Sequence, residues 1–194
     1  MRMSSRLLFA VALVILGACQ NLPPPPIYPE FRFTQLPKIG LDVARIEVRQ
    51  SYKSPLQAPN VEHQFPVTPA AAAARWAGDR LAAMGRAGTA VFTIEDASAT
   101  TERLPLIGGV RGTFTREQSE RYTAGLRVRL EVENAGGLAR GTASAHATRS
   151  QTLPEDISLN ERDRAFYLLT EQLINDLNAQ LEANIRQHLQ PLLR

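Results

Sequence analysis

One cysteine and three histidines are the side chains in this 194-residue sequence best suited to nucleophilic or metal chemistry. In an exported protein, Cys19 is a free thiol, one half of an intermolecular disulfide, or a nucleophile. His63, His146 and His188 are too scattered to form a local metal-binding motif, and no Gly-x-Ser-x-Gly nucleophile motif is present. We therefore expect no metal ion, no cofactor and no enzymatic activity.

Residues 108–112, Gly-Gly-Val-Arg-Gly, superficially resemble a phosphate-binding loop. Such a loop follows a strand and opens directly into a helix, whereas this segment leads to another strand. The simplest interpretation is a flexible connection between two strands. The alternative is a contact segment, because Ile107 and Phe114 place apolar side chains there, where they favour binding to lipid or to a protein partner.

Residues 1–18 have the layout of an export signal: a charged stub, the uncharged and mostly apolar residues 7–16, and then small residues. The apolar run is too short to cross a bilayer, which needs about 20 residues. Without Arg2 and Arg6 the chain has 20 basic and 19 acidic side chains. This near-neutral charge gives nucleic-acid binding little support, and a single cysteine excludes a disulfide-rich scaffold.

The sequence Leu16-Gly17-Ala18-Cys19 resembles the lipobox of bacterial lipoproteins. The resemblance implies that signal peptidase II recognises Leu16, Gly17 and Ala18, cuts before Cys19, and leaves that cysteine carrying three fatty chains. Several chains hold a protein firmly on a membrane, whereas one is marginal. The alternative is an ordinary cleavage site with an incidental cysteine. In such lipoproteins an aspartate after the cysteine typically retains the protein in the inner membrane, so Gln20 favours the periplasmic face of the outer membrane.

Residues 19–37 are rich in proline and show no apolar periodicity. Consecutive prolines favour an extended polyproline II conformation of about 3.1 Å per residue. We interpret this segment as a spacer between lipid and domain; a proline-rich ligand for a peptide-binding module is the alternative. A single domain is then expected over residues 38–194.

The rest of the chain alternates between strand and helix patterns. Strands are predicted at residues 41–52, 89–97, 122–133 and 138–149, and helices from Thr68 to Gly85 and from Leu159 to Gln190. The order β-α-β-β-β-α predicts an α+β two-layer sandwich, with two helices on one face of a mostly antiparallel four-stranded sheet. The other face carries alternating charges and is expected to meet water. Gly and Ala alone form the inner face of the last strand, which indicates either a closely packed helix or a weakly specified edge strand.

The final predicted helix suggests an interaction surface. Its 32 residues would extend about 48 Å, whereas a strand of ten residues covers about 33 Å. We therefore expect its last turns to overhang the sheet. The apolar residues there, Ile185, Leu189, Leu192 and Leu193, would then need a partner.

The lipobox, the proline-rich spacer, the element order and the long terminal helix together resemble the LptE family of lipopolysaccharide-assembly lipoproteins. The similarity is strongest from Glu120 to about Ile185 and includes Tyr122-x-x-x-Leu126-x-Val128. The resemblance implies two helices against a four-stranded sheet, in a protein that plugs an outer-membrane barrel.

A second resemblance, to auxiliary lipoproteins of Mla- or Pqi-type lipid-transport systems, rests on the same membrane address and on the helix containing Trp76. Both resemblances imply a non-catalytic role. We therefore expect a membrane-anchored lipoprotein that binds an outer-membrane or transporter protein, with lipid or lipopolysaccharide as its candidate ligands. A periplasmic hydrolase is the third alternative.

Overall fold

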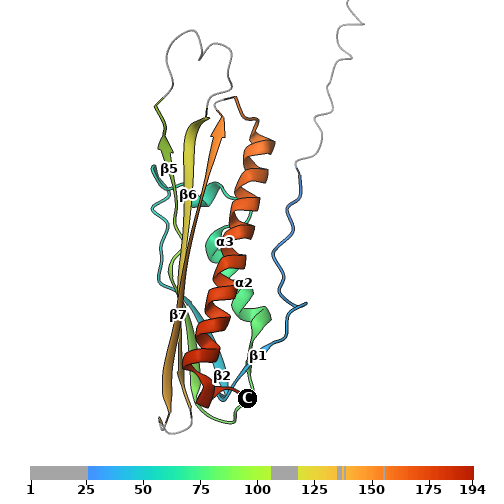
Figure 1. Cartoon of the computed structure of the whole chain (residues 1–194), viewed down its shortest axis with the longest axis vertical. Coiled ribbons are helices and arrows are strands. Elements are labelled where there is room, and N and C mark those ends of the chain that lie inside the picture. Colours follow the sequence, from blue (N-terminus) through green and yellow to red (C-terminus); the bar gives the residue numbers. More distant parts are fainter. Residues whose placement is uncertain (1–25, 106–117, 135–136, 138, 155) are drawn as a thin grey trace, which may run out of the picture.

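The computed structural model describes residues 26–105, 118–134, 137, 139–154 and 156–194. The predicted α+β class is confirmed: two long helices pack on a five-stranded mixed sheet, and a two-stranded sheet lies beside them. Figure 1 shows the long strands and the terminal helix, α3 (Leu159–His188), running side by side along the long axis. We call the end of the domain at which α3 begins the upper end, and the end at which α3 finishes the lower end.

The strands are β1 (Ile39–Leu41), β2 (Arg45–Gln50), β3 (Leu81–Ala83), β4 (Thr89–Asp96), β5 (Ala99–Arg103), β6 (Gln118–Glu133) and β7 (Arg140–Pro154). The other long helix is α2 (Pro69–Arg80), and short 3-10 helices lie at Glu62–Gln64 and Gln190–Leu192. β4 and β5 pair with one edge of β6, end to end and antiparallel, and β7 pairs antiparallel with the other edge. β2 extends the sheet by pairing parallel with β4.

Several elements differ from the prediction. The predicted strand 41–52 is shorter, at Arg45–Gln50, and β1 and β3 were not predicted. The first helix ends at Arg80 rather than at Gly85, because Leu81–Ala83 leave the helix to pair with β1. The sequence predicts a loop where β5 lies, because Ala99–Arg103 shows no apolar alternation. An irregularity between Ile94 and Asp96 separates β4 from β5. The sheet is therefore five-stranded rather than four-stranded, and it is mostly antiparallel as predicted, with one parallel pair, β2 with β4.

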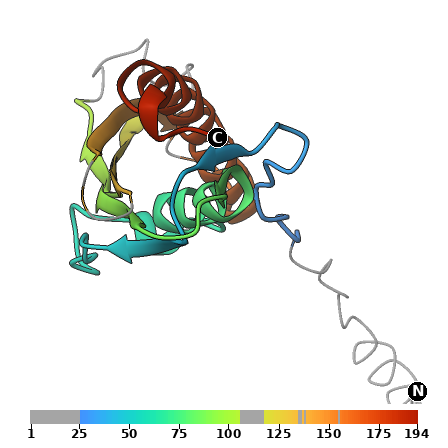
Figure 2. The ribbon, with the colours of Figure 1, turned by 90° about the horizontal axis from the view of Figure 1, so that it is seen from below.

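The core lies between the sheet and the two helices. Figure 2 shows the sheet curving around α2 and α3, which lie on the same side of it. Trp76 of α2 stacks on Phe92 of β4, with ring centroids 5.7 Å apart, and donates its indole N–H to Asn178 of α3 at 2.8 Å. One aromatic side chain thus ties both helices to the sheet.

The inner face of β7 brings α3 very close. Ala143, Ala145 and Ala147 are buried under the helix. At Gly141, an added Cβ would overlap the side chain of Leu189. The prediction of a closely packed helix is confirmed, and β7 is also an edge strand, because it pairs only with β6 among the described strands.

The expected overhang of the terminal helix is wrong. With 16 and 15 residues, β6 and β7 extend about 50 Å, which matches the roughly 45 Å of the 30-residue α3. Ile185 and Leu189 are completely buried, Leu192 is 2% exposed, and Leu193 packs partly buried against the core. These four residues complete the domain's own core and do not form a partner-binding surface.

The predicted domain boundary is also wrong, because residues 28–37 pack along the two helices. We call this segment the strap. Phe31 and Phe33 are buried in the core, and Phe31 stacks on Tyr167 of α3 with centroids 4.6 Å apart. The Tyr28 hydroxyl donates to the backbone carbonyl of Asn160 at 3.3 Å. The folded domain therefore begins near Tyr28 rather than at residue 38.

Buried polar groups hold the strap in place. The carboxylate of Asp79 accepts hydrogen bonds from the backbone N–H of Phe33 at 2.9 Å and from Arg32 at 3.2 Å. Burial alone would raise the pKa of Asp79, but these donors outweigh it and hold the pKa below its usual value. The fully buried Arg80 donates to the carbonyl of Pro37 at 2.5 Å and to the carboxylate of Glu182.

Candidate interaction surface

The predicted site residues do not come together in one place. Those outside the described residues are Leu16, Gly17, Ala18, Cys19, Ile107 and Phe114. The three histidines are exposed and lie on separate elements. Within the described ranges, no group of three or more His, Cys, Asp or Glu side chains is arranged to hold a metal ion. No helix in that same part of the chain is long and apolar enough to cross a membrane.

The most deeply buried acid, Glu62, belongs to a structural cluster. It is 3% exposed and accepts hydrogen bonds from the Tyr52 hydroxyl at 2.7 Å and from the backbone N–H of Ala99 at 3.1 Å. Burial acts to raise the pKa of Glu62, but the hydroxyls of Ser54 and Tyr52 and the backbone donors outweigh it and lower the pKa. Burial, then the bond to Glu62, raises the pKa of Tyr52. An ionised acid and a protonated phenol are not poised for proton transfer near neutral pH.

That cluster instead fixes the loop before α2 onto β5. The backbone N–H of Val61 donates to Ala99 at 2.8 Å, and that of Thr101 donates to Pro59 at 2.9 Å. The loop therefore covers the outer edge of β5.

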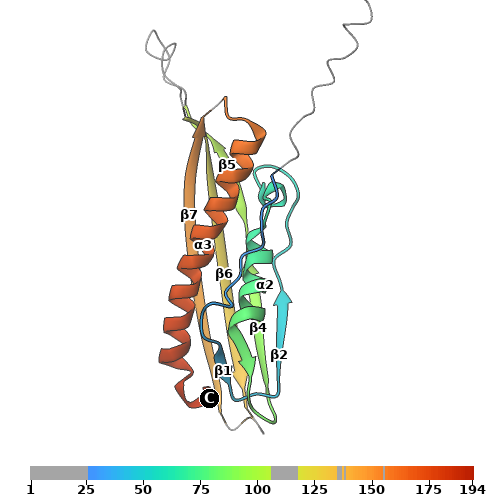
Figure 3. The same ribbon diagram turned by 90° about the vertical axis from the view of Figure 1, so that its right-hand side faces the viewer.

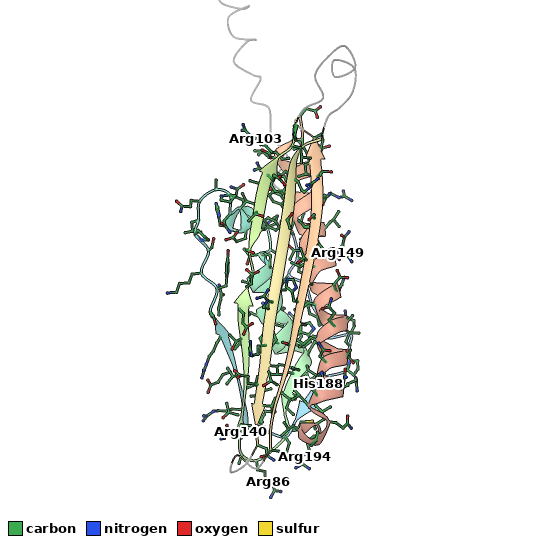
Figure 4. All side chains as sticks on the ribbon, turned by 60° about the vertical axis from the view of Figure 1, so that its left-hand side comes forward. Arg86, Arg103, Arg140, Arg149, His188 and Arg194 are labelled. Atoms are coloured by element: carbon green, nitrogen blue, oxygen red, sulfur yellow. The ribbon has the colours of Figure 1, made fainter. Side chains whose placement is uncertain are left out.

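The outer face of the sheet carries the alternating charges, and both α2 and α3 lie on the opposite face (Figure 4). Opposite charges pair across or along the strands, as in Arg129 with Glu95 at 2.5 Å and Arg140 with Glu133 at 3.2 Å. A groove of about 640 Å³ at the lower end of this face is lined by both signs of charge. The pairing neutralises the face locally, so it offers no concentrated site for an anion.

The edge of β7 differs from the other sheet edges. β2 is short and carries charges at Arg45, Glu47 and Arg49, and β5 is covered by its loop. Short length, charge and covering are the usual ways in which proteins protect an edge. By contrast, β7 has 15 residues, and from His146 to Thr152 its outward-facing side chains are Ser and Thr apart from His146. The one charged side chain in this part of β7, Arg149, lies on the helix side and pairs with Asp176 of α3.

The backbone of β7 directs alternate groups toward this edge. Gly125 of β6 donates its N–H to Ser98, on the side away from β7, so it does not bond to Thr148 opposite it. The carbonyl of Ser144 accepts a hydrogen bond from the Asn184 side chain of α3 at 2.7 Å. The backbone N–H and C=O groups of successive residues alternate between the two edges of an antiparallel strand. The N–H and C=O groups of the even-numbered residues of β7 therefore point away from β6.

Only the lower part of this edge is covered. Figure 3 shows α3 crossing β7 at an angle, with its C-terminal half beside the lower part of the strand. No hydrogen bond from another described residue reaches the backbone groups of His146, Thr148, Ser150 or Thr152. We call the edge from His146 to Thr152 the open edge; it offers four N–H and four C=O groups to another strand. The sequence indicated an edge strand here. Which part of the edge is exposed depends on the position of α3 across β7, which local sequence patterns do not give.

The fold and this surface define a two-layer α+β protein with one long exposed strand edge. A comparison with protein-family models finds no family that matches the chain, and a comparison with curated proteins finds no match either.

Proposed function

We propose that the chain is a non-catalytic lipoprotein of the cell envelope that binds a protein partner through the open edge. In this proposal, acylated Cys19 attaches the protein to the periplasmic face of the outer membrane, and the partner is an envelope-assembly protein, as in the LptE-like hypothesis. The observation that supports it best is the open edge, since pairing with a partner strand would satisfy its eight backbone groups.

Site-specific photo-crosslinking in cells tests this proposal. A benzophenone side chain is placed at Thr148 or Ser150, and at Thr142 as the matched control on the same face of the same strand. We expect adducts to a membrane protein from the first two positions and none from Thr142. Removing the acyl site with Cys19→Ala should abolish them. Identification of a barrel protein supports an assembly role, whereas transporter or lipid-carrier components support the Mla- or Pqi-type alternative.

A backbone change adds a second readout. Thr148→Pro removes an N–H that points away from β6, so the β6–β7 pairing should survive while partner-strand pairing is lost. We expect unchanged circular dichroism and loss of the adduct at Ser150. Binding through this edge would be refuted if the acylated, folded protein gave no adduct at Thr148 or Ser150. It would also be refuted if the adduct at Ser150 were unaffected by Thr148→Pro.

A further inference from the structure

Two of the most exposed apolar side chains lie at the upper end of the domain. Ile27 is 95% exposed and Leu159, the first residue of α3, is 69% exposed. Tyr28 follows Ile27, and Asn160 follows Leu159. The Tyr28 hydroxyl donates to the Asn160 carbonyl, although the two residues are 132 positions apart in the sequence. In the figures, the first described residues and the start of α3 lie at this same end. Two large exposed apolar side chains therefore lie at the same end of the domain, where contact with water is unfavourable.

Chain length determines what lies next to them. Six residues lie between Cys19 and Pro26, the first described residue, and Ile27 comes eight residues after Cys19. Eight residues span about 25 Å in a polyproline II conformation and about 29 Å fully extended. An acyl chain on Cys19 would therefore keep Ile27 within about 29 Å of the lipid. The domain's long strands extend about 50 Å, so the tether is too short for the domain to stand inverted, with its lower end on the membrane.

Exposed charges of both signs lie at this end of the domain. Arg103 and Arg164 are exposed, and Figure 4 shows Arg103 at the upper tip; the acidic Glu102 and Glu161 are exposed at the same end. Arginine side chains there would meet lipid phosphate groups, while the apolar side chains enter the interface beneath.

We propose that the upper end of the domain rests on the bilayer, with Ile27 and Leu159 inserted at the level of the lipid headgroups. The inference rests on the proposed acylation of Cys19, and it adds a fixed orientation to the proposed attachment. The domain then stands with its lower end farthest from the membrane.

The chain provides a matched control at the opposite end. Met84 is 62% exposed, close to the value for Leu159, and it is two residues from Arg86, which lies at the lower tip in Figure 4. A membrane that covers the upper end would leave Met84 in water. General attraction of exposed apolar residues to lipid would affect Leu159 and Met84 alike.

The test uses the complete lipoprotein with one added cysteine: Ile27→Cys, Leu159→Cys or Met84→Cys. Acylation consumes the natural thiol, so a fluorescent maleimide labels only the new site. In vesicles of phosphatidylethanolamine and phosphatidylglycerol, we expect blue-shifted emission and at least twofold quenching by nitroxide lipids at positions 27 and 159. Position 84 should remain unquenched.

The label at position 159 decides the outcome, because position 27 adjoins the tether. Acylated, vesicle-bound protein whose position-159 label stays in water would overturn the proposal, even with quenching at position 27. Mass spectrometry of the N-terminal peptide tests acylation separately. If Cys19 is not acylated, the proposed attachment fails. Quenching of the same labels is then measured with the mature chain attached to nickel-chelating lipid by an N-terminal His tag. Absence of quenching at position 159 there would overturn the contact surface independently.

Discussion

Replacing Phe33 by alanine tests whether the strap belongs to the folded domain. Phe33 is 4% exposed, and its backbone N–H donates to the buried carboxylate of Asp79. A free spacer would tolerate the change, because removing an exposed side chain alters stability by no more than about 0.5 kcal/mol.

The structure gives the expected size of the effect. Truncating a buried phenylalanine to alanine removes its transfer free energy and leaves a cavity, and together these cost about 3–5 kcal/mol. The strap lies on the helices at the domain surface, where neighbouring atoms can relax into the gap, so we expect about 3 kcal/mol. In a domain of this length, each kcal/mol lowers the melting temperature by about 2–4 °C. The predicted loss is therefore about 6–12 °C.

Urea and thermal unfolding of a soluble form that begins after Cys19 measure the effect. Ile27→Ala is the control, because Ile27 is six residues away and 95% exposed. We expect Ile27→Ala to match the unmodified protein and Phe33→Ala to lose about 3 kcal/mol in free energy of unfolding. Equal stability of the two variants would show that residues 28–37 do act as a spacer, and would refute the boundary derived from the structure.

Three further predictions concern the stability of the domain. Gly141→Val should lose about 2 kcal/mol in urea unfolding, because the new side chain overlaps Leu189 beneath α3; unchanged stability would mean that the helix does not pack as described. Gly78→Ala should gain about 0.5–1 kcal/mol in the same assay, because this helical glycine has nothing within 4 Å of an added Cβ; destabilisation there would contradict the open environment. Glu62→Gln should lose about 2 kcal/mol at pH 7, where the charged form accepts its hydrogen bonds. Because the pKa of Glu62 is lowered by folding, its stabilisation is complete above the ordinary value of about 4.3 and is lost as the pH falls through the folded value. Unfolding at pH 3 should show a smaller difference between Glu62→Gln and the unmodified protein.

Local sequence patterns predicted the elements that local forces determine. Apolar alternation placed β4 and the centres of β6 and β7 correctly. The capping box at Ser158 placed the start of α3, where the Ser158 and Glu161 side chains each bond the other's backbone N–H. These signals depend on residues a few positions apart, so the sequence contains them completely.

Such patterns did not predict the full lengths of β6 and β7 or the long-range contacts of the strap. The outer parts of β6 and β7 have no regular apolar alternation, yet they pair with each other as far as Gln118 and Pro154. That pairing lengthens the sheet until α3 no longer overhangs it. The strap was missed for a similar reason: Phe31 and Phe33 lie among prolines, and Asp79, which accepts the backbone N–H of Phe33, is 46 residues away.

The two proposals constrain each other through the direction of β7. The strand runs from Arg140 at the lower end to Pro154 near the start of α3, so the open edge lies in its upper half. From His146 to Thr152 the strand covers about 20 Å. If the upper end rests on the bilayer, a partner strand paired there lies alongside the half of the domain nearest the membrane. A membrane protein, or one held at its surface, reaches this position more readily than a freely diffusing periplasmic protein. The crosslinking partner should therefore fractionate with membranes even when the lipoprotein itself is released by protease cleavage before Tyr28.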